Sequence, residues 1–171
     1  LTFPDEGTES KDISAYDKTW KATIGEDVWT IENFNSNKWN NNWKYIRCGS
    51  KNFESVASIT SPAIDQPISN IVLTIDKITK DKINSIKLQV ATDADCNNVT
   101  EEIPAKIEDG DLIFRPTKPA ANNYYKFVFD CQKGSSNGLI QVSKIAYYKV
   151  GDAPEIVDIT NTAETAYTIA K

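Results

Sequence analysis

The residues with the clearest chemical potential lie in a polar loop from Asn33 to Gly49, which reads NFNSNKWNNNWKYIRCG. An exposed indole such as that of Trp39 can cover the apolar face of a sugar ring, while neighbouring amides bond to its hydroxyl groups. Arg47 adds a charge-assisted donor if its side chain points to the same side. We therefore predict a ligand-binding site formed by Trp39, Asn37, Asn41, Asn42 and Arg47, with Asn35 and Asn40 close by.

The same loop also has a purely structural interpretation. Trp43 can begin a strand and be buried, as we expect for Trp29, while Trp39 can fold over the edge of the core. Asparagine is common in turns that need left-handed backbone conformers. Sugar binding by Trp39 and closure of the core by Trp39 are two alternatives that the loop leaves open.

The residue types give little support to catalysis. The chain has no histidine, which removes the commonest general base and every Ser-His or Cys-His nucleophile. Glu101 and Glu102 are adjacent on an expected strand, so they point to opposite faces and make a poor pair for glycoside hydrolysis. Asp109 and Asp111 flank Gly110 and fit a turn. We predict no catalytic residue and no enzyme.

The stretch ATDADCNN is a candidate for metal binding, because it places Asp93, Asp95 and Asn97 at alternating positions. This spacing resembles the start of a calcium loop. An EF-hand loop counted from Asp93 needs Gly at its sixth position and Glu at its twelfth, where the chain has Asn98 and Pro104. We predict no metal or other cofactor, with a structural calcium ion at this loop as the alternative.

The three cysteines, Cys48, Cys96 and Cys131, are far apart and have no CxxC spacing. This pattern argues against a zinc knuckle or a thioredoxin-like motif and favours small apolar residues in a core. Because their number is odd, at least one thiol stays free or pairs between chains. Which of them pair, if any do, is left open by the sequence.

Size and charge limit the partners. With 171 residues, 40% of them apolar, the chain can bury the core of one domain with extensions. It has 19 basic and 24 acidic residues, a formal net charge of -5, and no stripe of Lys and Arg. We therefore expect no nucleic-acid partner for this domain. No run of ~18 apolar residues is present, so we expect no membrane span.

Side-chain alternation with a period of two predicts strands along most of the chain. In residues 140–150 the apolar positions change parity near Lys144, which a bulge would explain. The polar segment DKITKDKINS, residues 76–85, suits a hairpin between two of the strands. The other expected strands lie near residues 29–32, 43–48, 56–60, 71–76, 86–91, 112–115 and 125–131.

No window shows helical spacing of apolar residues. About eight or nine strands separated by Gly, Pro, Asn and Asp predict an all-β fold, an antiparallel sandwich or barrel. Residues 1–12 are polar and predict a solvated leader, and residues 13–150 form the β domain. Residues 151–171 lack a patterned core face and are predicted to be a linker or the start of a following domain.

Five stretches together resemble a known family: VWTIENFN, WKYIRCGSKNFESVASITSPAI, INSIKLQVATD, YYKFVFDC and NGLIQVSKIAYYKV. They resemble the galactose-binding-like, discoidin-type jelly-roll module of surface lipoproteins from gut Bacteroidetes, over roughly residues 20 to 150. The tail ITNTAETAYTIAK resembles the lead-in to an OB-fold-like domain that often follows this module.

The resemblance implies a jelly-roll β-sandwich at the cell surface or outside the cell, in an outer-membrane lipoprotein with a lipid anchor upstream of Leu1. It also implies a glycan ligand, so we expect a non-catalytic carbohydrate-binding or adhesive module. The alternative is a structural spacer without a ligand, in a larger lipoprotein whose OB-fold-like domain binds nucleic acid or another partner. No family motif marks a particular residue as functional.

Overall fold

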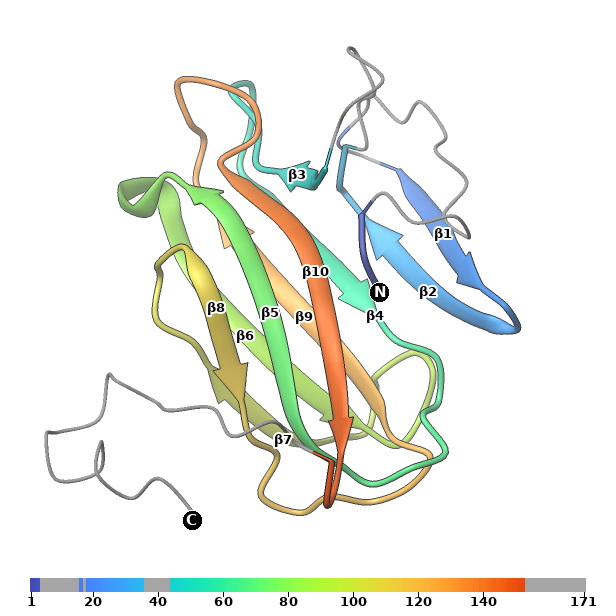
Figure 1. Cartoon of the computed structure of the whole chain (residues 1–171). Coiled ribbons are helices and arrows are strands. Elements are labelled where there is room, and N and C mark those ends of the chain that lie inside the picture. The colour runs from blue at the N-terminus through green and yellow to red at the C-terminus, as the bar shows by residue number, and fades with distance from the viewer. Residues whose placement is uncertain (4–15, 17, 36–43, 153–171) are drawn as a thin grey trace, which may run out of the picture.

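The computed structural model of the chain describes residues 1–3, 16, 18–35 and 44–152 (Figure 1). These residues form ten strands and one short 3-10 helix, and none of them lies in an α-helix. The predicted all-β class is confirmed, with slightly more strands than the eight or nine expected. No helix in this part of the chain is long and apolar enough to cross a membrane.

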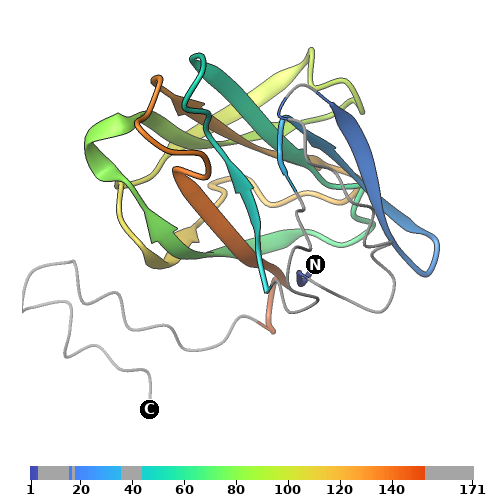
Figure 2. The ribbon, with the colours of Figure 1, turned by 90° about the horizontal axis from the view of Figure 1, so that it is seen from above.

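The strands form two antiparallel sheets, which are the two layers seen from above in Figure 2. The six-stranded sheet contains, in spatial order, β1 (Thr19–Ile24), β2 (Asp27–Glu32), β4 (Ser55–Thr60), β9 (Tyr124–Cys131), β6 (Ile83–Ala91) and β7 (Val99–Pro104). The four-stranded sheet contains β3 (Ile46–Cys48), β10 (Ile140–Lys149), β5 (Ile68–Ile78) and β8 (Gly110–Phe114).

Strands β3 to β10 follow the chain path of a jelly roll. Each strand crosses to the other sheet except β6 and β7, which are neighbours in one hairpin. The resulting orders, β3-β10-β5-β8 and β4-β9-β6-β7, are those of an eight-stranded double Greek key. The β1–β2 hairpin extends the larger sheet beyond β4.

The hairpin predicted at residues 76–85 is wrong. Strands β5 and β6 lie in opposite sheets, and the 3-10 helix η1 (Lys80–Lys82) carries the chain between them. Most of the polar segment belongs to the ends of these two strands, because β5 extends to Ile78 and β6 begins at Ile83. Alternation therefore identified both strands but gave the wrong partner for each.

The core lies between the inward faces of the two sheets. In β9, every second side chain from Tyr125 to Cys131 is buried, which confirms the alternation predicted there. The ring of Phe127 meets Phe114 of β8 edge to face, with 5.0 Å between ring centroids. Phe129 meets Phe34 in the same way at 5.3 Å. Aromatic contacts of this geometry stabilise the packing beyond the burial of apolar area.

The predicted irregularity in the last strand is confirmed. The register of β10 against β5 shifts between Gln141 and Val142 and again between Val142 and Lys144. Beyond this bulge Ile145 is buried and Tyr147 is half-buried, so the inward face continues on the opposite parity. The bulge therefore directs the side chain of Tyr147 between the sheets.

The first three residues lie along the edge of β10. The backbone N–H of Ile145 donates to the carbonyl of Leu1 at 2.8 Å. The ring of Phe3 is only 2% exposed and packs edge-on against Trp20 of β1, with ring centroids 6.4 Å apart. Phe3 is therefore not solvated as the expected leader would have it, whereas Thr2 is exposed. Residues 4–12 of that leader lie outside the described part of the chain.

Candidate functional site

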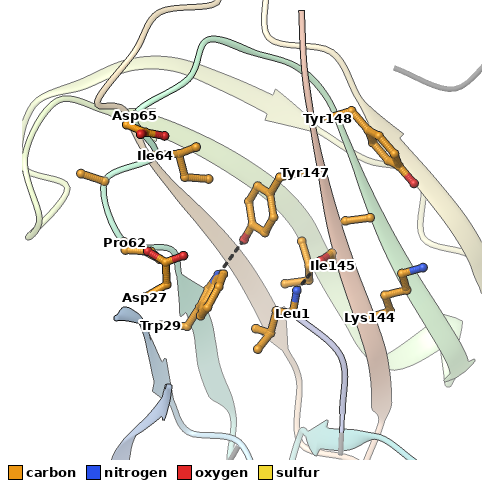
Figure 3. A pocket seen from close by; sticks show the side chains of 12 residues that line it. Leu1, Asp27, Trp29, Pro62, Ile64, Asp65, Lys144, Ile145, Tyr147 and Tyr148 are labelled. Atoms are coloured by element: carbon orange, nitrogen blue, oxygen red, sulfur yellow. Dashed lines mark hydrogen bonds between the residues drawn. The ribbon is translucent and has the colours of Figure 1, made fainter. Parts of the chain in front are cut away.

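A pocket opens where the neighbours of β10 end along one of its edges. Strand β3 pairs with Ile140–Val142 of β10, and Thr2 pairs with Lys144. Within the residues that the structure describes, no strand continues along this edge beyond Ile145. A pocket of about 670 Å³ lies here, between β2, the loop after β4, and β10 (Figure 3).

Two aromatic side chains from opposite sheets form the inner wall of the pocket. The indole Nε1–H of Trp29 donates to the hydroxyl oxygen of Tyr147 at 3.2 Å, and their ring centroids are 6.4 Å apart (Figure 3). Tyr125 of β9 packs behind Tyr147 at 6.2 Å. Trp29 itself is 7% exposed, so it offers little surface for stacking on a ligand.

The hydroxyl of Tyr147 is neutral at ordinary pH. Burial raises its pKa well above the usual value for tyrosine, and the hydrogen bond from Trp29 offsets only part of this effect. The oxygen accepts a bond from the indole, while the hydroxyl proton remains as a donor. The wall of the pocket therefore combines aromatic carbon with a fixed polar atom.

The rim of the pocket is acidic on one side and apolar beside it. Asp27 of β2 and Asp65 of the β4–β5 loop are both exposed, and both line the pocket (Figure 3). Pro62 and Ile64, in the same loop as Asp65, supply apolar surface to the pocket. The loop is held in place because the N–H of Ile64 donates to the carbonyl of Asn123 at 3.1 Å. Carboxylates accept hydrogen bonds from hydroxyl groups, so the rim suits a polyhydroxylated ligand.

The backbone of β10 adds further polar groups. Both the N–H and the carbonyl of Ile145 bond to Leu1 along this edge. Backbone groups of an antiparallel strand point alternately to its two neighbours, so those of Tyr147 point to the same side as those of Ile145. Tyr147 thus directs a backbone donor and a backbone acceptor toward the pocket, as well as its hydroxyl.

The predicted binding loop is described only at its ends. Trp39, Asn37, Asn41 and Asn42 lie within residues 36–43, outside the described part of the chain. At the base of the loop, Asn35 and Arg47 exchange two backbone hydrogen bonds of 2.8 and 2.9 Å. The loop is therefore closed by an antiparallel pair, and Asn35 is buried at its start.

Arg47 is the predicted site residue that the structure describes, and it lies apart from the pocket. Its side chain is half-buried beside Tyr16, where its positive charge lowers a tyrosine pKa that burial raises. It also packs on Gly138, where a Cβ atom would lie 2.6 Å from the Arg47 Cδ. The structure therefore places Arg47 against the protein and not among the residues that line the pocket.

The loop that resembles the start of a calcium site is organised by its first carboxylate, that of Asp93. The two oxygens of Asp93 accept the backbone N–H groups of Asn97 and Asn98, at 3.0 and 2.7 Å. These bonds hold the pKa of Asp93 below its usual range. Among the described residues, no group of three or more Cys, Asp or Glu side chains is arranged to hold a metal ion. The alternating polar residues are thus explained as a turn closed by Asp93.

Sequence reasoning missed the pocket as a site. Its residues come from four distant segments, Leu1 and those near Trp29, Asp65 and Tyr147, and neither spacing nor motif connects them. Trp29 was expected in the core, and it is buried there as predicted. One sequence feature near the site was visible: the apolar positions change from even to odd residue numbers near Lys144. This change marks the bulge beyond which Tyr147 points inward.

Comparisons with known proteins add no family. No protein-family model and no curated protein matches the chain. Among solved structures, the secreted serine protease VesC from Vibrio cholerae aligns with 10% sequence identity and a TM-score of 0.38. The alignment covers 80% of this chain and 25% of the protease chain, so this chain spans about a quarter of that protein. A likeness of this size carries no argument about function.

Proposed function

We propose that this β-sandwich is a non-catalytic carbohydrate-binding module of a cell-surface protein, and that a sugar binds in the pocket between β2 and β10. The observation that carries this proposal is the pocket itself, with a volume of about 670 Å³ and a lining of aromatic, apolar, carboxylate and ammonium groups. Ligand pockets in proteins typically measure ~300 to 1,000 Å³ and combine such groups.

The chemistry of the lining favours a polyhydroxylated ligand. Asp27 and Asp65 can each accept hydrogen bonds from sugar hydroxyls, while Pro62 and Ile64 can pack on the apolar C–H groups of a ring. The backbone N–H of Tyr147 supplies a donor within the same pocket. A single sugar held in this way would bind at ~0.1 to 1 mM, about -4 to -5.5 kcal/mol.

The acidic pair considered for catalysis supports a non-catalytic role. The carboxylate of Glu101 accepts the N–H of Thr117, at 3.0 and 3.1 Å from its two oxygens. Glu102 instead bonds Gln89 and forms a salt bridge with Lys87 at 3.1 Å. The two carboxylates therefore have separate partners, and neither lines the pocket.

The loop of residues 36–43 is a second proposed contact of the same class. Trp39 supplies the stacking face that the largely buried Trp29 does not, and Asn37, Asn41 and Asn42 supply amides. The cell-surface location is proposed on the family resemblance. Whether the loop or the pocket holds the sugar is decided by matched substitutions.

The test is a titration of the full chain with plant, host and bacterial glycans, monitored by tryptophan fluorescence. Binding to the pocket predicts a saturable signal that Asp65→Asn weakens at least tenfold, while the matched exposed control Asp109→Asn leaves it unchanged. Loss with Trp39→Ala and not with Asp65→Asn would move the site to the loop. A flat response of the wild-type protein to all glycans would overturn the proposal in favour of a structural spacer.

A further inference from the structure

Two of the three cysteines meet inside the sandwich. Cys48 is the last residue of β3 in the smaller sheet, and Cys131 is the last residue of β9 in the larger sheet. Both have 0% exposure. Figure 1 shows β3 and the end of β9 at the same end of the molecule. Both thiols are free in this structure, and burial together with the neighbouring Cys131 thiol raises the pKa of Cys48.

The pairing of each strand places the two thiols in the core. Cys48 lies opposite Ile140 of β10, and Cys131 lies between Ser55 of β4 and Ile83 of β6. The side chains of both cysteines therefore come from the inward faces of their sheets. Because β3 and β9 belong to sheets that face each other, no strand lies between the two thiols.

The chain that follows each cysteine holds the two sheets together at this end. The N–H of Gly134 donates to the carbonyl of Ser50 at 3.0 Å, and the N–H of Gly138 donates to the carbonyl of Gly49 at 2.9 Å. Leu139 fills the space between them, since a Cβ atom on Gly49 or Gly134 would lie 2.7 or 2.5 Å from its side chain. The contact between the thiols is thus held by the backbone on both sides.

We propose that Cys48 and Cys131 form a disulfide bond that joins the two sheets when the protein folds in an oxidising environment. Cys96 is the cysteine left unpaired. It lies in the turn that Asp93 closes after β6, is half-buried, and has Lys126, Asp93 and Asp95 as its charged neighbours. The three cysteines would then form one disulfide and leave one free thiol.

The bond would form by exchange with a small-molecule disulfide such as oxidised glutathione. One protein thiolate attacks a sulfur of the oxidant and releases one reduced thiol. The second protein thiolate then attacks the mixed disulfide and releases the other. The protein loses two hydrogen atoms, and the oxidant is reduced to two thiols. Because both sulfurs are buried in the folded chain, exchange occurs while the sheets are still assembling.

The cross-link would act on the least anchored strand. Strand β3 has three residues and pairs with β10 over Ile140–Val142. A covalent bond from Cys48 to β9 would tie this strand to the centre of the opposite sheet. It would also constrain the long chain segment between the two cysteines in the unfolded state, which is the usual source of disulfide stabilisation.

The test uses the full chain, reduced and unfolded, then refolded with reduced and oxidised glutathione. After denaturation and alkylation, we expect one labelled cysteine, Cys96, and a mass equal to that of the reduced chain minus two hydrogen atoms plus the mass added by one label. Digestion without reductant should give one peptide pair joining Cys48 to Cys131. Labelling of all three cysteines, or a link that includes Cys96, would overturn the proposal.

Matched variants give a second readout. Cys96→Ser should keep the cross-link, and adding a reductant should lower its melting midpoint by about 5 to 15 °C. A Cys48→Ala/Cys131→Ala double variant should show no response to the reductant. The mass measurement on the wild-type chain decides the question even if the double variant does not fold.

Discussion

The indole nitrogen of Trp29 and the hydroxyl oxygen of Tyr147 lie 3.2 Å apart and form a hydrogen bond between the two sheets. Trp29 belongs to β2 of the larger sheet, and Tyr147 belongs to β10 of the smaller one. The bond fixes the inner wall of the pocket, so the site and the stability of the sandwich depend on the same pair.

Removing the hydroxyl tests this relationship. In Tyr147→Phe the ring keeps its shape, but the buried indole N–H loses its acceptor. We expect the free energy of unfolding to fall by about 1 to 2 kcal/mol, measured by urea denaturation. Tyr148→Phe is the matched control, because it removes the hydroxyl of a neighbouring tyrosine while the bond from Trp29 goes to Tyr147. An equal loss in both variants would contradict a specific role for the bond.

The stability of the protein should fall at high pH. Burial raises the pKa of Tyr147, Tyr16 and Tyr125 above the ordinary value near 10. The unfolded chain therefore releases these protons first, and the stability present below pH ~10 is lost as the pH rises further. Denaturation measured between pH 8 and about pH 11 should show this decline, and Tyr147→Phe should make it shallower. If stability fell equally steeply with pH in the wild type and in Tyr147→Phe, burial of the Tyr147 hydroxyl would not contribute to the decline.

The N-terminal residues should contribute to stability. Phe3 is buried against Trp20, so Phe3→Ala leaves a cavity beside β1. We expect a loss of about 3 kcal/mol in the free energy of unfolding. Thr2→Ala, at an exposed neighbouring position, should change it by less than ~0.5 kcal/mol. If Phe3→Ala behaved like Thr2→Ala, the segment would be a solvated leader after all.

Side-chain alternation predicted the faces of most strands but not their partners. In β9 the large apolar residues recur at every second position, and only a strand with a period of two buries them all on one face. In β7, the edge strand VTEEIP, no residue is fully buried, so its sequence carries almost no pattern. In β1, Trp20 and Ala22 are buried, but the small side chain of Ala22 hides the alternation. Strand β7 pairs with β6 and strand β1 pairs with β2, each in a hairpin. Such pairing cannot be read from the alternation of side chains.

The pocket was beyond prediction for a related reason. It depends on where pairing along β10 stops, and that point is set by the short β3 and by the N-terminal residues on the same edge. Neither segment can be read from periodicity, since β3 and the described N-terminal segment have three residues each and alternation identifies a strand only over about four to eight. The bulge near Lys144 was predictable because it breaks a long pattern, and it orients Tyr147 within the site.

The Asp93 turn gives a prediction about calcium. Both oxygens of Asp93 already accept backbone N–H groups, from Asn97 and Asn98, and Thr92 accepts a bond from the Asn98 amide at 2.6 Å. A calcium ion at this turn would compete with those N–H groups for Asp93. It needs six to eight oxygen ligands, and no group of three or more Cys, Asp or Glu side chains gathers among the described residues. We therefore expect the melting midpoint to be the same with millimolar calcium and with a chelator. A calcium-dependent rise that Asp93→Asn abolishes would instead show that the turn opens to bind the ion.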